Sequence, residues 1–383
     1  MRLKLSDIRD FLKRADMVLF SLCLASSIMG LVIISSATRT MGSSYIYVQL
    51  AAMLIGIGLY FLFTVIDADI IADQWPLLVV TELVLLLLLI PFGISDNTGN
   101  SGWIRFMGVG IQPSEIVKVI YIVLSARHIS YLKGYRNLSS PLSVVQLAAH
   151  FGILFVLILF VSSDLGSALV FFFIFAVMMF IAGLKLYWFL FGGAAMAVVI
   201  PLAWNNFLTT RQKERILAPY IPDVIDPDGH GINWQPNQAQ IALSSGRLTG
   251  TGLYQGTQTQ STAIDSKHAD FIFASIGEEL GMIGCLVVII LLVAIIIRCV
   301  YVGLRCHSTF GMLICCGVAT MVTFQMFNSI GMCIGLTPVI GLTLPFFSYG
   351  GSSMFSTFAA MGIVSGIHYR PKPSQFRTYT SEF

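Results

Sequence analysis

The chain has 383 residues, of which 56% are hydrophobic and only 11% are charged. Soluble domains carry about 25% charged residues, so this composition excludes an ordinary soluble enzyme and indicates a chain that lies mostly in lipid. The net charge is +3, and no basic patch interleaved with aromatic residues indicates nucleic-acid binding. The seven cysteines lie in or beside apolar runs without metal-ligand spacing, which favours packing roles over disulfides or a zinc site.

Apolar segments of about 20 residues recur along the whole chain, which is the length that crosses a bilayer. The sequence therefore predicts an all-α polytopic membrane protein, with one integral membrane domain over residues 1–383. Polar residues interrupt the fourth, eighth and tenth of about ten predicted spans. These spans are roughly 17–36, 46–64, 76–93, 112–130, 146–162, 166–183, 187–204, 271–298, 309–335 and 344–367.

Lysine and arginine are distributed unequally between the two sides of these spans. The short loops of one side hold only Arg39 and Arg105, whereas the tails and loops of the other side hold Arg2, Lys4, Arg9, Lys13, Arg14, Arg127, Lys133, Arg136, Lys185, Arg298, Arg305, Arg370, Lys372 and Arg377. The side rich in positive charge is expected to be cytoplasmic. Both tails, 1–16 and 368–383, are then cytoplasmic. The long segment 205–270, between spans seven and eight, becomes a large extracytoplasmic loop.

Ionisable residues inside the predicted spans need a partner or water. Glu115 and Lys118 are three residues apart and share a helix face, so they either neutralise each other for insertion or line a polar cavity. Asp164 precedes the sixth span, where it is expected to cap a helix at a cavity mouth. Glu278 and Glu279 must face partners or a polar crevice, and we expect them to support the eighth helix.

Two further groups lie in the long segment 205–270, and the second of them, at its end, is at the outer membrane edge. The basic run 211–215 is either a solvated helix face, which its spacing favours, or a phosphate-binding cluster. Asp270 stands beside Lys267 and His268 at the start of the eighth span. A carboxylate there can accept a proton from a hydroxyl nucleophile, cap the helix, or be a simple interface charge, and the residues alone leave these alternatives open.

Four motifs in chain order resemble those of the SEDS family, which is represented by RodA and FtsW. The first includes Gly99, Trp103 and Ile104 and continues into QPSEIVK (112–118), and the second is SDLG (163–166). The others are HADFIFASIGEELG (268–281) and GLTPVIGLTLPFFSYGGSS (335–353). The sequence departs from the family pattern at several positions, among them Ser163 in place of proline and Arg247 in place of glycine.

The resemblance implies a peptidoglycan glycosyltransferase that polymerises lipid II into β-1,4 glycan strands outside the membrane and releases undecaprenyl diphosphate. The family's essential carboxylate corresponds to Asp270, which we interpret as the base that deprotonates the acceptor hydroxyl. Arg105, Arg211, Arg215 or a divalent cation, Mg²⁺ or Mn²⁺, would meet the departing diphosphate. The full predicted set of substrate-binding residues is Trp103, Arg105, Gln112, Ser114, Glu115, Lys118, Asp164, Arg211, Arg215, His268, Ser348 and Gly350.

The resemblance also implies a bacterial cytoplasmic membrane protein that works with a class B penicillin-binding protein in cell elongation or division, with a slight preference for a RodA-like role. A flippase or transporter of lipid-linked precursors is the main alternative, since a polar cavity among ten spans would suit it. We see no repeat between the two halves of the chain, which disfavours a carrier. A scaffold without catalytic activity is the third alternative.

Overall fold

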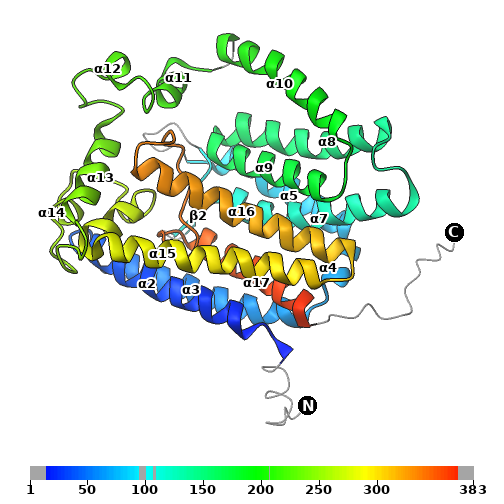
Figure 1. Cartoon of the computed structure of the whole chain (residues 1–383), viewed down its shortest axis with the longest axis horizontal. Helices are drawn as coiled ribbons and strands as arrows, with labels where there is room; N and C mark the ends of the chain where they lie inside the picture. Colours follow the sequence, from blue (N-terminus) through cyan, green and yellow to red (C-terminus); the bar gives the residue numbers. More distant parts are fainter. Residues whose placement is uncertain (1–13, 95–100, 107–108, 207, 370–383) are drawn as a thin grey trace.

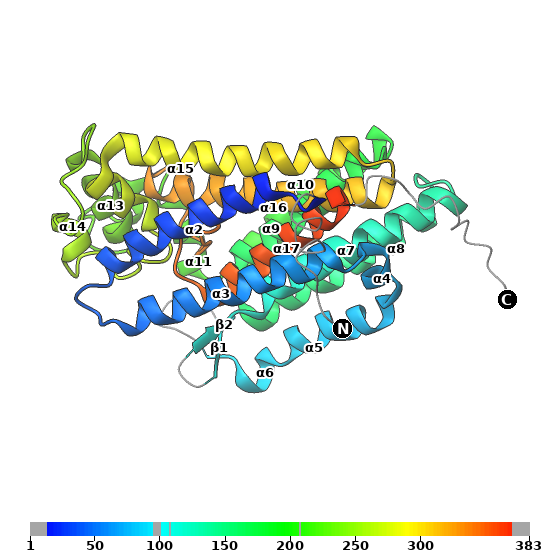
Figure 2. The same ribbon diagram turned by 90° about the horizontal axis from the view of Figure 1, so that it is seen from below.

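The computed structural model describes residues 14–94, 101–106, 109–206 and 208–369. Nearly all of the two predicted tails lies outside the described residues. The long helices run along a common direction, so that the bundle has two ends (Figures 1 and 2). The helices in chain order are α2 (Met17–Ala37), α3 (Ser44–Val65), α4 (Ala68–Asp73), α5 (Trp75–Leu87), α6 (Leu89–Phe92), α7 (Pro113–Tyr135), α8 (Pro141–Leu157), a π-helical turn Ile158–Ser162, α9 (Leu165–Ile181), α10 (Leu186–Asn206), α11 (Thr210–Leu217), α12 (Pro222–Ile225), α13 (Trp234–Ser245), α14 (Thr257–Gln260), α15 (Ile272–Arg305), α16 (Thr309–Cys333) and α17 (Gly351–Tyr369).

Each predicted span coincides with a helix or a pair of consecutive helices, which confirms the all-α class. Within the described residues, seven helical segments are long and apolar enough to cross a membrane. Helices α7 and α17 are not among them, yet both are largely buried in the bundle, where their polar side chains avoid lipid. Ten crossings and the orientation of the chain stay predictions.

The tenth predicted span, 344–367, begins too early. Its helix starts only at Gly351, because the preceding segment 334–350 is irregular. The amide of Gln49 in α3 satisfies part of this backbone: its Nε2 donates to the carbonyl of Ser348 (3.1 Å), and its Oε1 accepts from the N–H of Gly350 (3.1 Å). Non-helical backbone at membrane depth requires such internal partners.

Two glycines let helices approach the irregular segment closely. A Cβ atom on Gly30 of α2 would lie 2.7 Å from the carbonyl oxygen of Phe346, and one on Gly166 of α9 would lie 2.4 Å from that of Ile340. Neither contact is tolerable for a real side chain. The segment is therefore clamped between α2 and α9, and any larger residue at these positions would displace backbone.

Helix α15 is broken at Gly281, whose φ of 67° is not helical. Residues 247–252 fill the break with four backbone hydrogen bonds. The N–H groups of Thr251 and Gly252 donate to the carbonyls of Glu278 and Glu279, while those of Met282 and Ile283 donate to the carbonyls of Arg247 and Leu248. Arg247 itself adopts a left-handed φ of 47°, at the position where the family pattern has glycine.

The four short helices α11 to α14 all belong to the predicted outer loop, and α13 and α14 cover one end of the bundle while α4 lies at the other (Figure 1). A two-stranded hairpin, β1 (Ile104–Phe106) and β2 (Val109–Ile111), precedes α7. Helix α10 has no buried residue and lies at the edge of the bundle, so its apolar surface is open to lipid.

We expect Gly30→Ala to lower the unfolding temperature of the purified protein in detergent, because forcing a methyl group against backbone costs about 1–3 kcal/mol. Gly58→Ala in the neighbouring helix α3 is the matched control, since nothing lies within 4 Å of its added Cβ. Equal unfolding temperatures for the two variants would contradict the clamp.

Candidate active site

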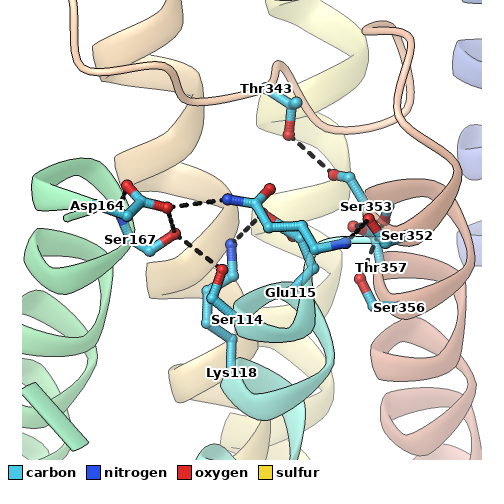
Figure 3. A network of polar contacts seen from close by, with 11 residues as sticks. Ser114, Glu115, Lys118, Asp164, Ser167, Thr343, Ser352, Ser353, Ser356 and Thr357 are labelled. Atoms are coloured by element: carbon cyan, nitrogen blue, oxygen red, sulfur yellow. Dashed lines mark hydrogen bonds and ion pairs between the residues drawn. The ribbon is translucent and has the colours of Figure 1, made fainter. Parts of the chain in front are cut away.

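Asp164 is the centre of a buried polar network at the start of α9 (Figure 3). One of its oxygens, Oδ1, accepts a hydrogen bond from the N–H of Ser167 (2.9 Å), which makes Asp164 the N-cap of this helix. The other, Oδ2, accepts from the Ser167 hydroxyl (2.7 Å) and from Nε2 of Gln112 (2.9 Å). The predicted cap is thus observed, and it is also bonded to α7.

The network brings the first turns of three helices together. The hydroxyls of Ser114 and Ser167 join α7 to α9 at 3.2 Å, and the N–H of Gln112 donates to Oγ of Ser352 in the first turn of α17 (3.1 Å). Thr343 of the irregular segment and Ser353 of α17 share a further hydrogen bond (2.9 Å). Helix N-termini carry partial positive charge, so this end of the bundle favours an anionic ligand.

Glu115 and Lys118 form a buried ion pair one turn below Gln112, with 2.7 Å between Oε1 and Nζ. Both side chains are at most 4% exposed. The pair is therefore self-neutralised, and it lies next to Ser114 of the Asp164 network (Figure 3). Whether it contacts substrate stays a prediction.

The turn that carries Asp270 is tied to the irregular segment through its backbone. The hydroxyl of Ser348 donates to the carbonyl of Ala269 (2.7 Å), and the N–H of Tyr349 donates to that of His268 (2.8 Å). Among the described residues, the half-buried carboxylate of Asp270 makes no hydrogen bond. Asp270 is thus held firmly by its neighbours, and both of its oxygens remain available.

The two aspartates flank the irregular segment. A Cβ on Gly341 would lie 3.9 Å from Oδ2 of Asp270, and Gly166, two residues after Asp164, touches the carbonyl of Ile340. Burial and the negative charge of Asp164 raise the pKa of Asp270 to about 6, against the opposing effect of Arg215 from α11. A carboxyl with this pKa is half-ionised near pH 6 and can take up a proton near neutrality.

Helix α11 presents basic residues to this end of the bundle. Burial, together with the charge of Arg211, lowers the pKa of Arg215, whereas the charge of Asp270 raises it. Arg211 is exposed and Arg215 is half-buried. The spacing of the run 211–215 favoured a solvated helix face. In the structure one of its arginines, Arg215, interacts electrostatically with Asp270.

The remaining predicted residues lie around this centre. Burial lowers the pKa of His268 to about 4, and its ring contacts those of Tyr45 and Tyr349 at 5.1 and 5.4 Å, so it is neutral near pH 7. Trp103 packs on the hairpin against Gly110, and Arg105 is an exposed residue of β1. Gly99 of the family pattern lies outside the described residues.

Ser348 and Gly350 have structural contacts. Oγ of Ser348 accepts from the N–H of Leu344 (2.8 Å) as well as donating to Ala269, and Gly350 is bonded to Gln49. Their predicted contact with substrate stays a prediction, because the observed bonds explain them as supports of the irregular segment.

Glu278 and Glu279 bind the outer loop to α15. Glu278 accepts hydrogen bonds from the hydroxyl of Thr257, from the N–H of Gln258 and from both the N–H and the hydroxyl of Thr259, so it caps α14. Glu279 accepts from the hydroxyl of Ser36 and from Nε2 of Gln260. These contacts agree with the expectation that the two glutamates support the eighth helix.

Sequence reasoning missed a polar stripe on α16, made of Gln325, Asn328 and Ser329. All three are at most 4% exposed, and each has at least one side-chain polar atom without a hydrogen-bond partner in the described structure. A polar atom buried in this way costs about 1–3 kcal/mol in a dry core. The stripe therefore indicates a polar region of the bundle that water can enter. The i, i+3, i+4 spacing of these residues was the signal that the sequence offered for it.

Helical geometry gives the level of Gln325 in the bundle, which is that of the Asp164 network. Gly317 of α16 lies against Ile122 of α7 and Met178 of α9, and Phe324 stacks on Phe173 of α9 at 4.4 Å, so α16 runs antiparallel to α9. Gln325 is eight residues from Gly317, and Ser114 is eight residues from Ile122 in the same direction in space. Both therefore lie at about the same height along the bundle.

The described part of the chain contains no group of three or more His, Cys, Asp or Glu side chains arranged to hold a metal ion. A Mg²⁺ ion commonly needs only one or two carboxylates, because substrate phosphates and water complete its shell. Asp164 and Asp270 could supply the one or two carboxylates that such an ion needs. The predicted divalent cation stays a prediction.

Comparison with known proteins supports the resemblance. Residues 16–372 match the FtsW/RodA/SpoVE family model, described as "Cell cycle protein". Over 305 residues the chain is 33% identical to the peptidoglycan glycosyltransferase MrdB of Escherichia coli K12, covering 78% of this chain and 79% of MrdB. It is 32% identical to a probable peptidoglycan glycosyltransferase FtsW of Trichlorobacter lovleyi, covering 92% of each.

The fold also resembles solved structures. A chain from a study of structural coordination of polymerization and crosslinking by a peptidoglycan synthase complex aligns with a TM-score of 0.76 and 28% identity, covering 92% of this chain and 97% of that one. The crystal structure of the rod shape determining protein RodA from Thermus thermophilus aligns with a TM-score of 0.67 and 25% identity, covering 92% and 96%. Relatives of both the RodA and FtsW kinds match, so the slight preference for a RodA-like role stays a prediction. The chain belongs to the FtsW/RodA/SpoVE family of multi-pass membrane proteins, the SEDS family.

Proposed function

We propose that the protein is a peptidoglycan glycosyltransferase of the bacterial cytoplasmic membrane, which polymerises lipid II at the outer face. One observation carries the proposal: the carboxylate of Asp270 is half-buried and without a hydrogen-bond partner in the described structure, and its pKa is raised to about 6 beside Arg215. A general base works best with a pKa near the operating pH. The relatives' printed names support the same reaction.

The reaction would be a single inverting displacement. Asp270 accepts the proton of the acceptor 4-hydroxyl while that oxygen attacks the anomeric carbon of the donor sugar. The bond between this carbon and the diphosphate oxygen breaks, and undecaprenyl diphosphate leaves with the electron pair. Arg215, with Arg211 behind it, and the helix N-termini around Asp164 would stabilise the charge that develops on the diphosphate.

A divalent cation, Mg²⁺ or Mn²⁺, would supply further neutralisation of the diphosphate when bound. We assign Asp164 as its protein ligand, because a carboxylate that binds the ion would be a weaker base, and Asp270 serves as the base. We also propose that a class B penicillin-binding protein is the partner, which is consistent with the structural neighbour from a peptidoglycan synthase complex.

The transporter alternative finds less support in the structure. Carriers commonly use broken helices whose freed backbone groups bind substrate or ions. Helix α15 is broken, but residues 247–252 occupy the hydrogen-bonding groups at its break. The carboxylate of Asp270, by contrast, has no hydrogen-bond partner in the described structure and lies outside this break.

The first prediction concerns the base. Asp270→Asn should reduce polymerisation of labelled lipid II by the purified protein with its partner by about 10²-fold or more, because general-base catalysis contributes about 10²–10⁴. Asp265→Asn, an exposed aspartate on the same loop, is the control and should retain activity. Equal activity of both variants would exclude Asp270 as the base. Transbilayer movement of lipid II in vesicles without product would favour a transporter.

The second prediction concerns pH. The base form of Asp270 predominates above its pKa, so kcat/KM should fall as the pH decreases through about 6. Arg215→Gln removes a positive charge that lowers the pKa of Asp270. The acidic limb of the pH profile of kcat/KM should therefore move to higher pH. Lys213→Gln on the same helix is the matched control. A limb that moves to lower pH in Arg215→Gln, or not at all, would contradict the assigned interaction.

The third prediction tests the polar stripe of α16. Gln325→Leu should reduce polymerisation by about tenfold, a loss of the size that one hydrogen bond accounts for. Its unfolding temperature should not fall, because the replaced amide has no partner in the described structure. Thr323→Val is the control, since that hydroxyl bonds only to its own helix at Ala319. Retained activity in Gln325→Leu would remove the stripe from the site.

A further inference from the structure

A cavity with a largely apolar lining lies between α5, α7 and α8, near the end of the bundle that carries α4. It has a volume of about 740 Å³. Four of the residues that line it are basic in type, and none of the described lining residues is acidic; the four are Arg127, His128, Arg136 and His150. This cavity is separate from Asp270 and Asp164 and has no role in the proposed reaction.

The charges around this cavity are only partly compensated. Arg127 is paired with Asp73 (3.0 Å), and Nε2 of His150 contacts Oε1 of Glu82 (2.8 Å). Arg136, which follows the end of α7, has no side-chain partner in the described structure. The C-terminus of α7 carries a partial negative charge of about half an elementary charge, which repels an anion. The full positive charge of Arg136 is larger than this partial charge. The site therefore retains positive charge for an anion.

Aromatic residues at the cavity indicate its depth in the membrane. Trp75 and Tyr131 line it and are 48% and 58% exposed. Such rings are enriched at the membrane–water interface, at the level of lipid headgroups. The flanking surface is apolar and open, with Leu142 and Val145 57% and 60% exposed. A ligand seated here would have its phosphate beside Arg136 and its acyl chains along this apolar surface.

We propose that this cavity binds the phosphate group of an anionic glycerophospholipid. Planar guanidinium groups suit phosphate oxygens, and the cavity joins such a group to an interfacial aromatic rim and a lipid-facing wall. A free phosphate ion would need only the arginines, whereas the apolar surface and the interfacial depth favour a lipid. By the distribution of lysine and arginine, this end of the bundle would face the inner leaflet.

The test uses the full chain in detergent and native mass spectrometry with added phosphatidylglycerol or phosphatidylcholine. The wild-type protein should bind phosphatidylglycerol more tightly, and Arg136→Gln should weaken that binding by about fivefold, as expected for one basic residue at a lipid surface. Arg305→Gln is the matched control, because that guanidinium lies over the Tyr301 ring (4.5 Å) and does not line the cavity.

Each outcome decides the proposal. Preference for phosphatidylglycerol that is lost in Arg136→Gln and kept in Arg305→Gln supports it. Equal binding of the two lipids by the wild-type protein, or an unchanged preference in Arg136→Gln, overturns it. Displacement of phosphatidylglycerol by millimolar inorganic phosphate would reassign the cavity to a free anion. Arg136 is exposed, so its variant should fold, and an unchanged unfolding temperature without lipid checks this.

Discussion

The structure depends on satisfying the polar groups of an irregular backbone segment inside a helical bundle. Residues 334–350 have no helix of their own, and lipid offers no hydrogen bonds. Gln49 bonds part of this backbone, and Gly30 and Gly166 give it the space to pass between α2 and α9. The same segment then holds the Asp270 turn through Ser348 and Tyr349. The position of Asp270 therefore depends on the hydrogen bonds and the packing that hold residues 334–350 in place.

The carboxylates at the end of the bundle that carries Asp270 divide into two kinds because of their neighbours. Glu278, Glu279 and Asp164 accept hydrogen bonds that stabilise the charged form and join elements together. Asp270 is half-buried and makes no such bonds in the described structure, so its oxygens remain available and desolvation raises its pKa to about 6. Acids with several hydrogen bonds and one acid without any in the described structure thus lie within one region.

The two ends of the bundle have different electrostatic character. Helix N-termini, aspartates and Arg215 meet at the end with Asp270, whereas arginine and histidine side chains gather in the cavity at the α4 end. Between them the bundle interior is largely apolar, apart from buried polar residues such as the Glu115–Lys118 pair. This arrangement is compatible with chemistry at one membrane face and lipid contact at the other.

The sequence by itself determined the helical class, the approximate positions of the long helices and the family, because apolar runs of bilayer length and four ordered motifs are local features. It also singled out Asp164 as a helix cap and Asp270 as a candidate base. Tertiary structure decided the rest. The helix of the last span starts at Gly351, and Ser348 is a support, because Gln49, some 300 residues away in the chain, bonds to this backbone. The stripe of Gln325 and Asn328 gained meaning only from its burial and its level in the bundle. Hydrogen bonds and burial between distant segments leave no periodic pattern, so only the fold could reveal them.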